Sequence, residues 1–168
     1  MIKLYYKGTE IKNDVDSYIL NVYPLDNTSP FGFVMDNVYF KTAEHAIEYL
    51  KFKDSHFDIA KMILDANNPY IVKQLAKEYD EYKMKDFINV QEEYLKKIFM
   101  LKLEQNEMVK ETLLNTRDYD IYLYTNDEDT SLGYDQNNNG KNIFGFTWMK
   151  IRDEYNKNKN KEKVKIYK

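Results

Sequence analysis

Two acidic side chains stand where a carboxylate could take part in catalysis. Glu44 follows Thr42, a natural helix N-cap, within residues 39–52, and Asp129 lies in a long polar loop of residues 126–142. A carboxylate in the first turn of a helix faces the positive end of the helix dipole, so it tends to stay ionised unless it is desolvated. Two carboxylates suit an oxocarbenium-like transition state. One can stabilise the positive sugar carbon or activate water, while the other transfers protons.

Glu44 also begins a strip of charged side chains along the predicted helix. Glu48 and Lys51 follow it at i+4 and i+7, and an adjoining face is apolar, with Ala43, Ala46, Ile47 and Leu50. The strip can face a ligand, but it is more typical of a solvated helix surface. Acidic pairs arise by chance in a chain with 28 acidic residues, so physics alone indicates only an α+β domain compatible with hydrolysis.

The polar loop carries a second candidate, a calcium site. The run from Asp135 to Gly140 resembles the opening of an EF-hand loop, which has oxygen ligands at positions 1, 3 and 5 and glycine at position 6. Position 12, where an EF-hand needs a bidentate glutamate, is Phe146. A glycine-containing turn before the last helix explains the run better, with Asn142 either capping that helix or exposing backbone N–H groups to a phosphate.

The composition excludes several classes of protein. The absence of cysteine removes disulfides, thiol nucleophiles and thiolate zinc sites, and two histidines leave little for a histidine-built centre, so we expect no metal and no cofactor. A net charge of −3 gives no overall attraction to nucleic acid. The chain shows neither a secretory signal nor a run of about twenty apolar residues, which favours a soluble, cytoplasmic protein without membrane contact.

A length of 168 residues fits one domain, with 43% hydrophobic residues to form its core. Strands are expected over residues 2–6 and 17–23, from Asp120, and in a hairpin around Asp36-Asn37. Helices are expected after Thr42, over 56–66 with Ser55 as cap, from Pro69 with Asn68 as cap, over 86–104, over 107–115, and from Phe144. Residues 156–168 read as a basic, flexible tail after a domain of residues 1–155.

Several short motifs, in one order, resemble the NADAR (YbiA-like) family between Val22 and Tyr155. They are Asn27 with nearby aromatics, Thr42-x-Glu44-His45, Lys51-Phe52, Lys102, Leu113-Leu114-x-Thr116, Asp129-x-x-Leu132-Gly133, Gly140-x-Asn142-x-x-Gly145, Met149 and Arg152. The resemblance implies a compact, mainly helical α+β single domain with a small N-terminal antiparallel sheet. It also implies hydrolysis of an N-glycosidic bond, either of ADP-ribosyl groups on guanine bases, free or in nucleic acid, or of ribosylamino-pyrimidine phosphates of riboflavin synthesis.

Carried over residue by residue, the resemblance makes Glu44 and Asp129 the catalytic candidates. Glu44 would activate water or stabilise the ribosyl cation, and Asp129 would hold the ribose or assist proton transfer. The substrate-binding candidates that it implies are Asn27, His45, Lys51, Phe87, Gly133, Asn142 and Gly145. Lys51 would contact a phosphate or fix Glu44, and the two glycines would let backbone approach a ligand.

Four positions depart from the family pattern. Phe87 and Leu132 stand where the family has tryptophan or another aromatic residue, Tyr124 replaces a glutamate, and Glu48 replaces the glutamine of the helix. Leu132 and Tyr124 give weight to an alternative from another class, a non-catalytic module that binds ADP-ribose or a related nucleotide.

Overall fold

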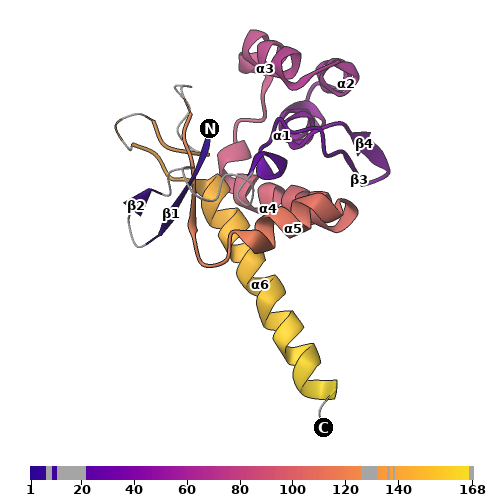
Figure 1. Cartoon of the computed structure of the whole chain (residues 1–168). Coiled ribbons are helices and arrows are strands. Elements are labelled where there is room, and N and C mark those ends of the chain that lie inside the picture. The colour runs from indigo at the N-terminus through magenta and orange to yellow at the C-terminus, as the bar shows by residue number, and fades with distance from the viewer. Residues whose placement is uncertain (7–8, 11–21, 126–131, 136, 138, 167–168) are drawn as a thin grey trace. The chain divides into compact units, whose positions relative to one another are not determined.

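The computed structural model describes residues 1–6, 9–10, 22–125, 132–135, 137 and 139–166. Contacts within the chain divide it into two compact units, residues Tyr23–Lys110 and the two ends, Met1–Val22 with Glu111–Lys168. The described residues form six α-helices and two small antiparallel sheets, which confirms the mainly helical α+β class (Figure 1).

The unit of residues 23–110 is built around one helix, α1 (Ala43–Phe52). A 3-10 turn, η1 (Tyr23–Leu25), and the hairpin of β3 (Phe33–Met35) and β4 (Val38–Phe40) precede it. The elements that follow are α2 (Phe57–Asp65), α3 (Pro69–Glu78), η2 (Asp80–Tyr82) and α4 (Phe87–Gln105). Helix α1 packs against α2, α3 and α4, so it touches every long helix of this unit (Figure 1).

Local sequence signals account for most of these boundaries. Asp36 and Asn37 both have positive φ angles, 51° and 63°, as a two-residue turn of the I′ kind requires, and the predicted hairpin is confirmed. Thr42 caps α1 by accepting from the His45 N–H, and Asn68 caps α3 with Pro69 in its first turn. Apolar residues of α1, α2 and α3 then form one core, composed of Phe52, Ile59, Ala60, Ile63, Ala66, Val72 and Ala76.

One predicted cap is wrong. Helix α2 starts after His56, which makes no side-chain cap, rather than after Ser55. The chain continues to turn after α1, because the His56 N–H still donates to the Phe52 carbonyl at 2.7 Å. The Ser55 hydroxyl therefore faces other carbonyls, including that of Tyr82 at 3.3 Å.

The unit formed by the two ends has a three-stranded sheet in the order β2-β1-β5, with β2 (Thr9–Glu10), β1 (Ile2–Tyr6) and β5 (Asp120–Leu123). Strand β1 thus pairs with a strand more than a hundred residues away, with Ile2 opposite Leu123. Helix α6 (Ile143–Ile166) packs on β5, and Trp148 and Ile151 are buried. Helix α5 (Glu107–Asn115) crosses from one unit into the other along the chain.

Two predictions concern residues next to segments that the structure does not describe. Of the strand expected over 17–23, residues 17–21 lie outside the described residues, and Tyr23 belongs to η1. Helix α6 continues to Ile166 through most of the expected tail, because no glycine or proline follows Gly145 and lysine and glutamate favour helix. In the part of the chain described here, no helix is long and apolar enough to cross a membrane.

Candidate functional site

Glu44 lies in the first turn of α1, held there by two interactions of its neighbours. Thr42 provides the N-cap, and the Glu44 backbone N–H donates to the Asn27 carbonyl at 2.9 Å. The second bond satisfies an N–H group that has no partner within the helix, and it fastens the loop of residues 26–29 to the start of α1. The backbone of Glu44 is therefore held by both the helix and the loop.

The carboxyl group of Glu44 is buried, with only 6% of the residue exposed. Its pKa is raised from 4.5 to about 7, chiefly by burial and next by the negative charge of Glu48. Lys73 and Lys51 act in the opposite direction, with the Lys73 Nζ 4.0 Å from Oε1, and Asp26 adds a smaller upward effect. Desolvation thus outweighs the helix dipole, and Glu44 changes charge near neutral pH, as a group that exchanges protons with a substrate should.

Glu48 and Lys51 continue the strip one and two turns along α1. The Lys51 ammonium lies 2.6 Å from Glu48 Oε1 and 5.4 Å from the centroid of the Phe87 ring, which itself stacks on Tyr94. Glu48 is only 7% exposed, and its Oε2 has no hydrogen-bond partner within the described residues. The interpretation of this strip as a solvated surface is therefore wrong, because both of its carboxylates are buried.

A buried lysine of α4 holds the loop of residues 26–29, which binds the start of α1. Lys102 is fully buried and donates to the Asp26 carbonyl at 2.6 Å and to the Ser29 hydroxyl at 2.8 Å. Burial lowers the pKa of Lys102 to about 7, against the opposing effect of Asp26. Asn27, between these two contacts, is 7% exposed and leaves its Oδ1 without a partner in the described part of the chain.

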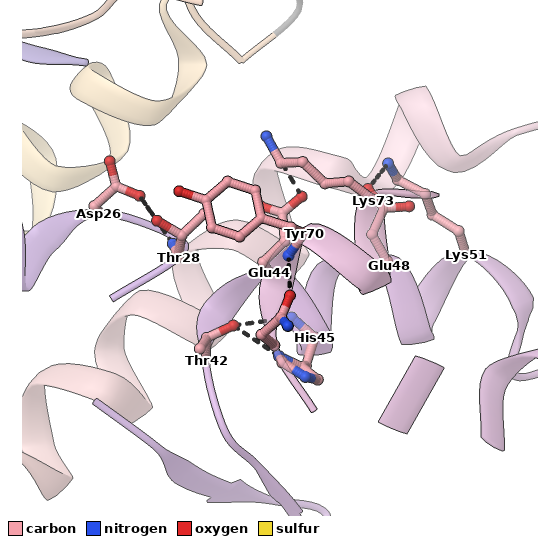
Figure 2. Close-up of polar contacts among 10 residues, drawn as sticks. Asp26, Thr28, Thr42, Glu44, His45, Glu48, Lys51, Tyr70 and Lys73 are labelled. Carbon is pink, nitrogen blue, oxygen red and sulfur yellow. Dashed lines mark hydrogen bonds and ion pairs between the residues drawn. The ribbon is translucent and has the colours of Figure 1, made fainter. Parts of the chain in front are cut away.

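Helix α3 supplies a residue that the sequence analysis missed. Figure 2 shows Lys73 reaching the Glu44 carboxyl as an ion pair. The predicted start of α3 at Pro69 placed Lys73 in its second turn. No local signal showed that α3 packs on α1, so Lys73 could not be assigned to Glu44 from the sequence.

His45 is placed differently from its neighbour. The structure puts its Nδ1 2.8 Å from the Thr42 hydroxyl and its Nε2 3.1 Å from the Ala66 carbonyl, and burial lowers its pKa. The Nε2 contact thus connects the start of α1 to the end of α2, while the Nδ1 contact lies within the N-terminal turn of α1. A role for His45 in substrate binding stays a prediction.

In the unit formed by the chain ends, Asn142 and Gly145 connect helix α6 to β5. The Asn142 side chain accepts from the Leu123 N–H at 3.0 Å and donates to the Ile121 carbonyl at 2.9 Å, and its φ is 46°. A Cβ at Gly145 would collide with that same Ile121 carbonyl. A Cβ at Gly133 would likewise collide with the Leu123 carbonyl. All three residues therefore lie against strand β5.

The calcium hypothesis finds no support among the residues described. Asp135 uses its carboxylate to accept from the backbone of Asn137 and Asn139 and from the Asn139 side chain, which lowers the pKa of Asp135. These bonds are typical of a turn. No group of three acidic or histidine side chains in the described ranges could hold a metal ion. Asp129 lies outside the described residues, so its pairing with Glu44 stays a prediction.

Comparison with known proteins adds to this geometry. Proteins named N-glycosidase YbiA from Shigella boydii serotype 4 (strain Sb227) and Shigella sonnei (strain Ss046) are each 22% identical over 155 residues, or 88% of this chain and 95% of theirs. The NMR structure of the E. coli protein YbiA shares the fold, with a TM-score of 0.69 at 20% identity over 89% of this chain and 84% of that one. The family model described as NADAR domain matches residues 5–156. Because that match covers most of both units, the chain belongs to the NADAR domain family.

Proposed function

We propose that this protein is an N-glycosidase that hydrolyses the bond between ribose and a ribosylated or ADP-ribosylated nucleobase. The observation that carries the proposal is the buried carboxyl of Glu44, whose pKa of about 7 suits proton transfer at neutral pH. The name N-glycosidase carried by its relatives supports the reaction class. The reaction consumes only water and requires no cofactor.

In the proposed step, water attacks the sugar carbon C1′ as the C1′–N bond breaks. The bonding electrons leave with the base nitrogen, and the new C1′–O bond comes from the water oxygen. Ionised Glu44 takes a proton from that water, and the departing base gains a proton from Glu44 or from solvent. Asp129 is assigned to the ribose or to this second transfer, on the family resemblance alone.

The charges around Glu44 support an anionic substrate of this kind. Lys73 and Lys51 place two ammonium groups around the carboxyl, on different helices. A phosphate or diphosphate on the substrate could pair with one of them, and a cationic site also favours the ionised form of Glu44. A cytoplasmic location, where phosphorylated and ADP-ribosylated nucleotides occur, belongs to the same proposal.

The test is a product assay by mass spectrometry in water enriched in 18O. Two substrates are compared, DNA that carries ADP-ribosylated guanine and a small ribosylamino-pyrimidine phosphate. An N-glycosidase releases the free base and leaves the label on the sugar carbon. Absence of free base from both substrates at high protein concentration would reject the proposal.

Glu44→Gln tests the role of the carboxyl. We expect a fall in turnover of about 10²–10⁴-fold, the usual contribution of a general base, with ligand binding retained. Glu78→Gln is the matched control, since Glu78 is an exposed glutamate on α3 and should leave turnover unchanged. Equal turnover in Glu44→Gln and the control would exclude Glu44 as the catalytic group.

A further inference from the structure

Glu48 keeps one buried carboxylate oxygen without a partner. Its Oε1 is taken by Lys51 at 2.6 Å, while its Oε2 is buried and unpaired within the described residues. Both terminal atoms are oxygens, so the unpaired atom is an acceptor whichever way the group is turned. A buried acceptor of this kind destabilises the protein unless something donates to it, which points to a hydrogen-bond donor on a ligand.

A second unpaired acceptor lies next to the same helix start. Asn27 Oδ1 is buried without a partner among the residues described, and the Asn27 backbone carbonyl is the one that binds the Glu44 N–H. Glu44 therefore has an unpaired acceptor on the adjoining loop and another one helical turn along α1. A phosphate has acceptors at neutral pH, not donors, so these two oxygens suit a different part of the substrate.

We infer that Glu48, with Asn27, accepts hydrogen bonds from the sugar hydroxyls of the substrate and makes the site selective for ribosides over 2′-deoxyribosides. The inference rests on the proposed function, in which Glu44 acts at C1′. Side chains at i and i+4 of a helix are neighbours, about 5–6 Å apart between Cβ atoms. The 2′-hydroxyl is attached to the carbon beside C1′, so a group one turn from Glu44 is placed to reach it.

The surroundings of Glu48 hold its carboxylate for such a role. Lys51 fixes one oxygen by its ion pair and is itself held over the Phe87 ring, as Figure 2 shows for the Lys51–Glu48 contact. Hydrogen bonds from the sugar 2-hydroxyl strengthen as positive charge develops in glycoside hydrolysis. The contact would therefore contribute to turnover as well as to binding.

The experiment measures binding by titration calorimetry, with ribose 5-phosphate, arabinose 5-phosphate and 2-deoxyribose 5-phosphate as probes. For the unmodified protein we expect ribose 5-phosphate to bind about 10–100-fold more tightly than the deoxy sugar, the range for hydrogen bonds to a charged group. The arabinose epimer should bind as weakly as the deoxy sugar, because its 2-hydroxyl points to the other face. Equal affinity for all three would overturn the inference without any variant.

Glu48→Gln then assigns the preference to this side chain. The substitution keeps the shape and removes the charge, so we expect the ratio of the two affinities to fall by about tenfold, whereas Glu78→Gln should keep it. An unchanged ratio in Glu48→Gln would overturn the inference. The product assay separates the two proposals, because turnover without a sugar preference rejects only this one, and a sugar preference without turnover rejects only the N-glycosidase.

Discussion

The helices α1 and α6 both begin with buried polar residues, and they use them in opposite ways. At the start of α6, the Asn142 amide donates to one backbone group of β5 and accepts from another. At the start of α1, Glu44 is buried beside Glu48 and Asn27, each of which has an oxygen with no partner in the described chain. The first arrangement is complete within the described residues, whereas those residues supply no donor to the two open acceptors of the second.

The two helix starts thus differ in whether their buried polar groups are paired within the described residues. A buried polar group that is fully paired stabilises the fold, whereas a buried acceptor without a donor lowers stability and is a candidate contact for a ligand. At the start of α6, the bonds of Asn142 and the close approach of Gly145 to β5 account for these two residue types. The start of α1 is where substitutions should change chemistry.

The largest effect on stability is expected from Asn142→Ala. Two backbone groups of β5, one buried and one part-buried, lose their partners at about 1–3 kcal/mol each, and alanine at a φ of 46° adds about 1–2 kcal/mol. Urea unfolding should show a loss of roughly 3–5 kcal/mol. Asn142→Gly, which tolerates the positive φ, should recover about 1 kcal/mol of that loss. Unchanged unfolding midpoints would mean that these bonds do not hold α6 on β5.

Glu44→Gln should change how stability depends on pH. The folded pKa of about 7 lies above the unfolded value of 4.5, so the folded protein holds an extra proton between these pH values and loses stability as pH rises through them. The difference amounts to roughly 3 kcal/mol between pH 4 and pH 8, and it should be absent in Glu44→Gln. Urea unfolding across this range measures it, with Glu78→Gln expected to follow the unmodified protein. Parallel curves for Glu44→Gln and the unmodified protein would contradict the burial of this carboxyl.

Glu48→Gln should lower the pKa of Glu44, since it removes the like charge but leaves the burial that has the larger effect. We expect a fall of about one pH unit, or about 1.4 kcal/mol, in the titration of the Glu44 carboxyl carbon by NMR. The acidic limb of the pH–rate profile should move in the same direction, if ionised Glu44 accepts the proton. An unchanged pKa would show that the two carboxylates do not interact.

The smallest expected effect is a difference in unfolding free energy between the loss of two hydroxyl groups, one near each end of α1. Thr42→Ala removes a side-chain cap and should cost about 1 kcal/mol in unfolding free energy. Ser55→Ala removes only long contacts to carbonyls, at 3.3 and 3.5 Å, and should cost no more than about 0.5 kcal/mol. Equal losses would show that Ser55 has a capping role that the structure does not assign to it.

Local signals in the sequence predicted much of the fold correctly. The Thr42 and Asn68 caps, the Asp36-Asn37 turn and the periodic helices were all read from residues within a few positions of one another. The cap predicted at Ser55 was wrong because the His56 N–H donates back to the Phe52 carbonyl. The chain therefore keeps turning after α1, and α2 starts after His56. The family followed from motif order, and the matched family model confirms it.

For the site, the sequence by itself determined that Glu44 stands in the first turn of a helix with Glu48 and Lys51 on one side of it. Only the tertiary structure decided that these carboxylates are buried, that Lys73 comes to them from α3, and that Lys102 supports the loop of Asn27. Helix position and capping depend on neighbours a few residues away. Burial and the ion pair with Lys73 depend on segments far apart in the sequence, and burial is the largest cause of the raised pKa of Glu44.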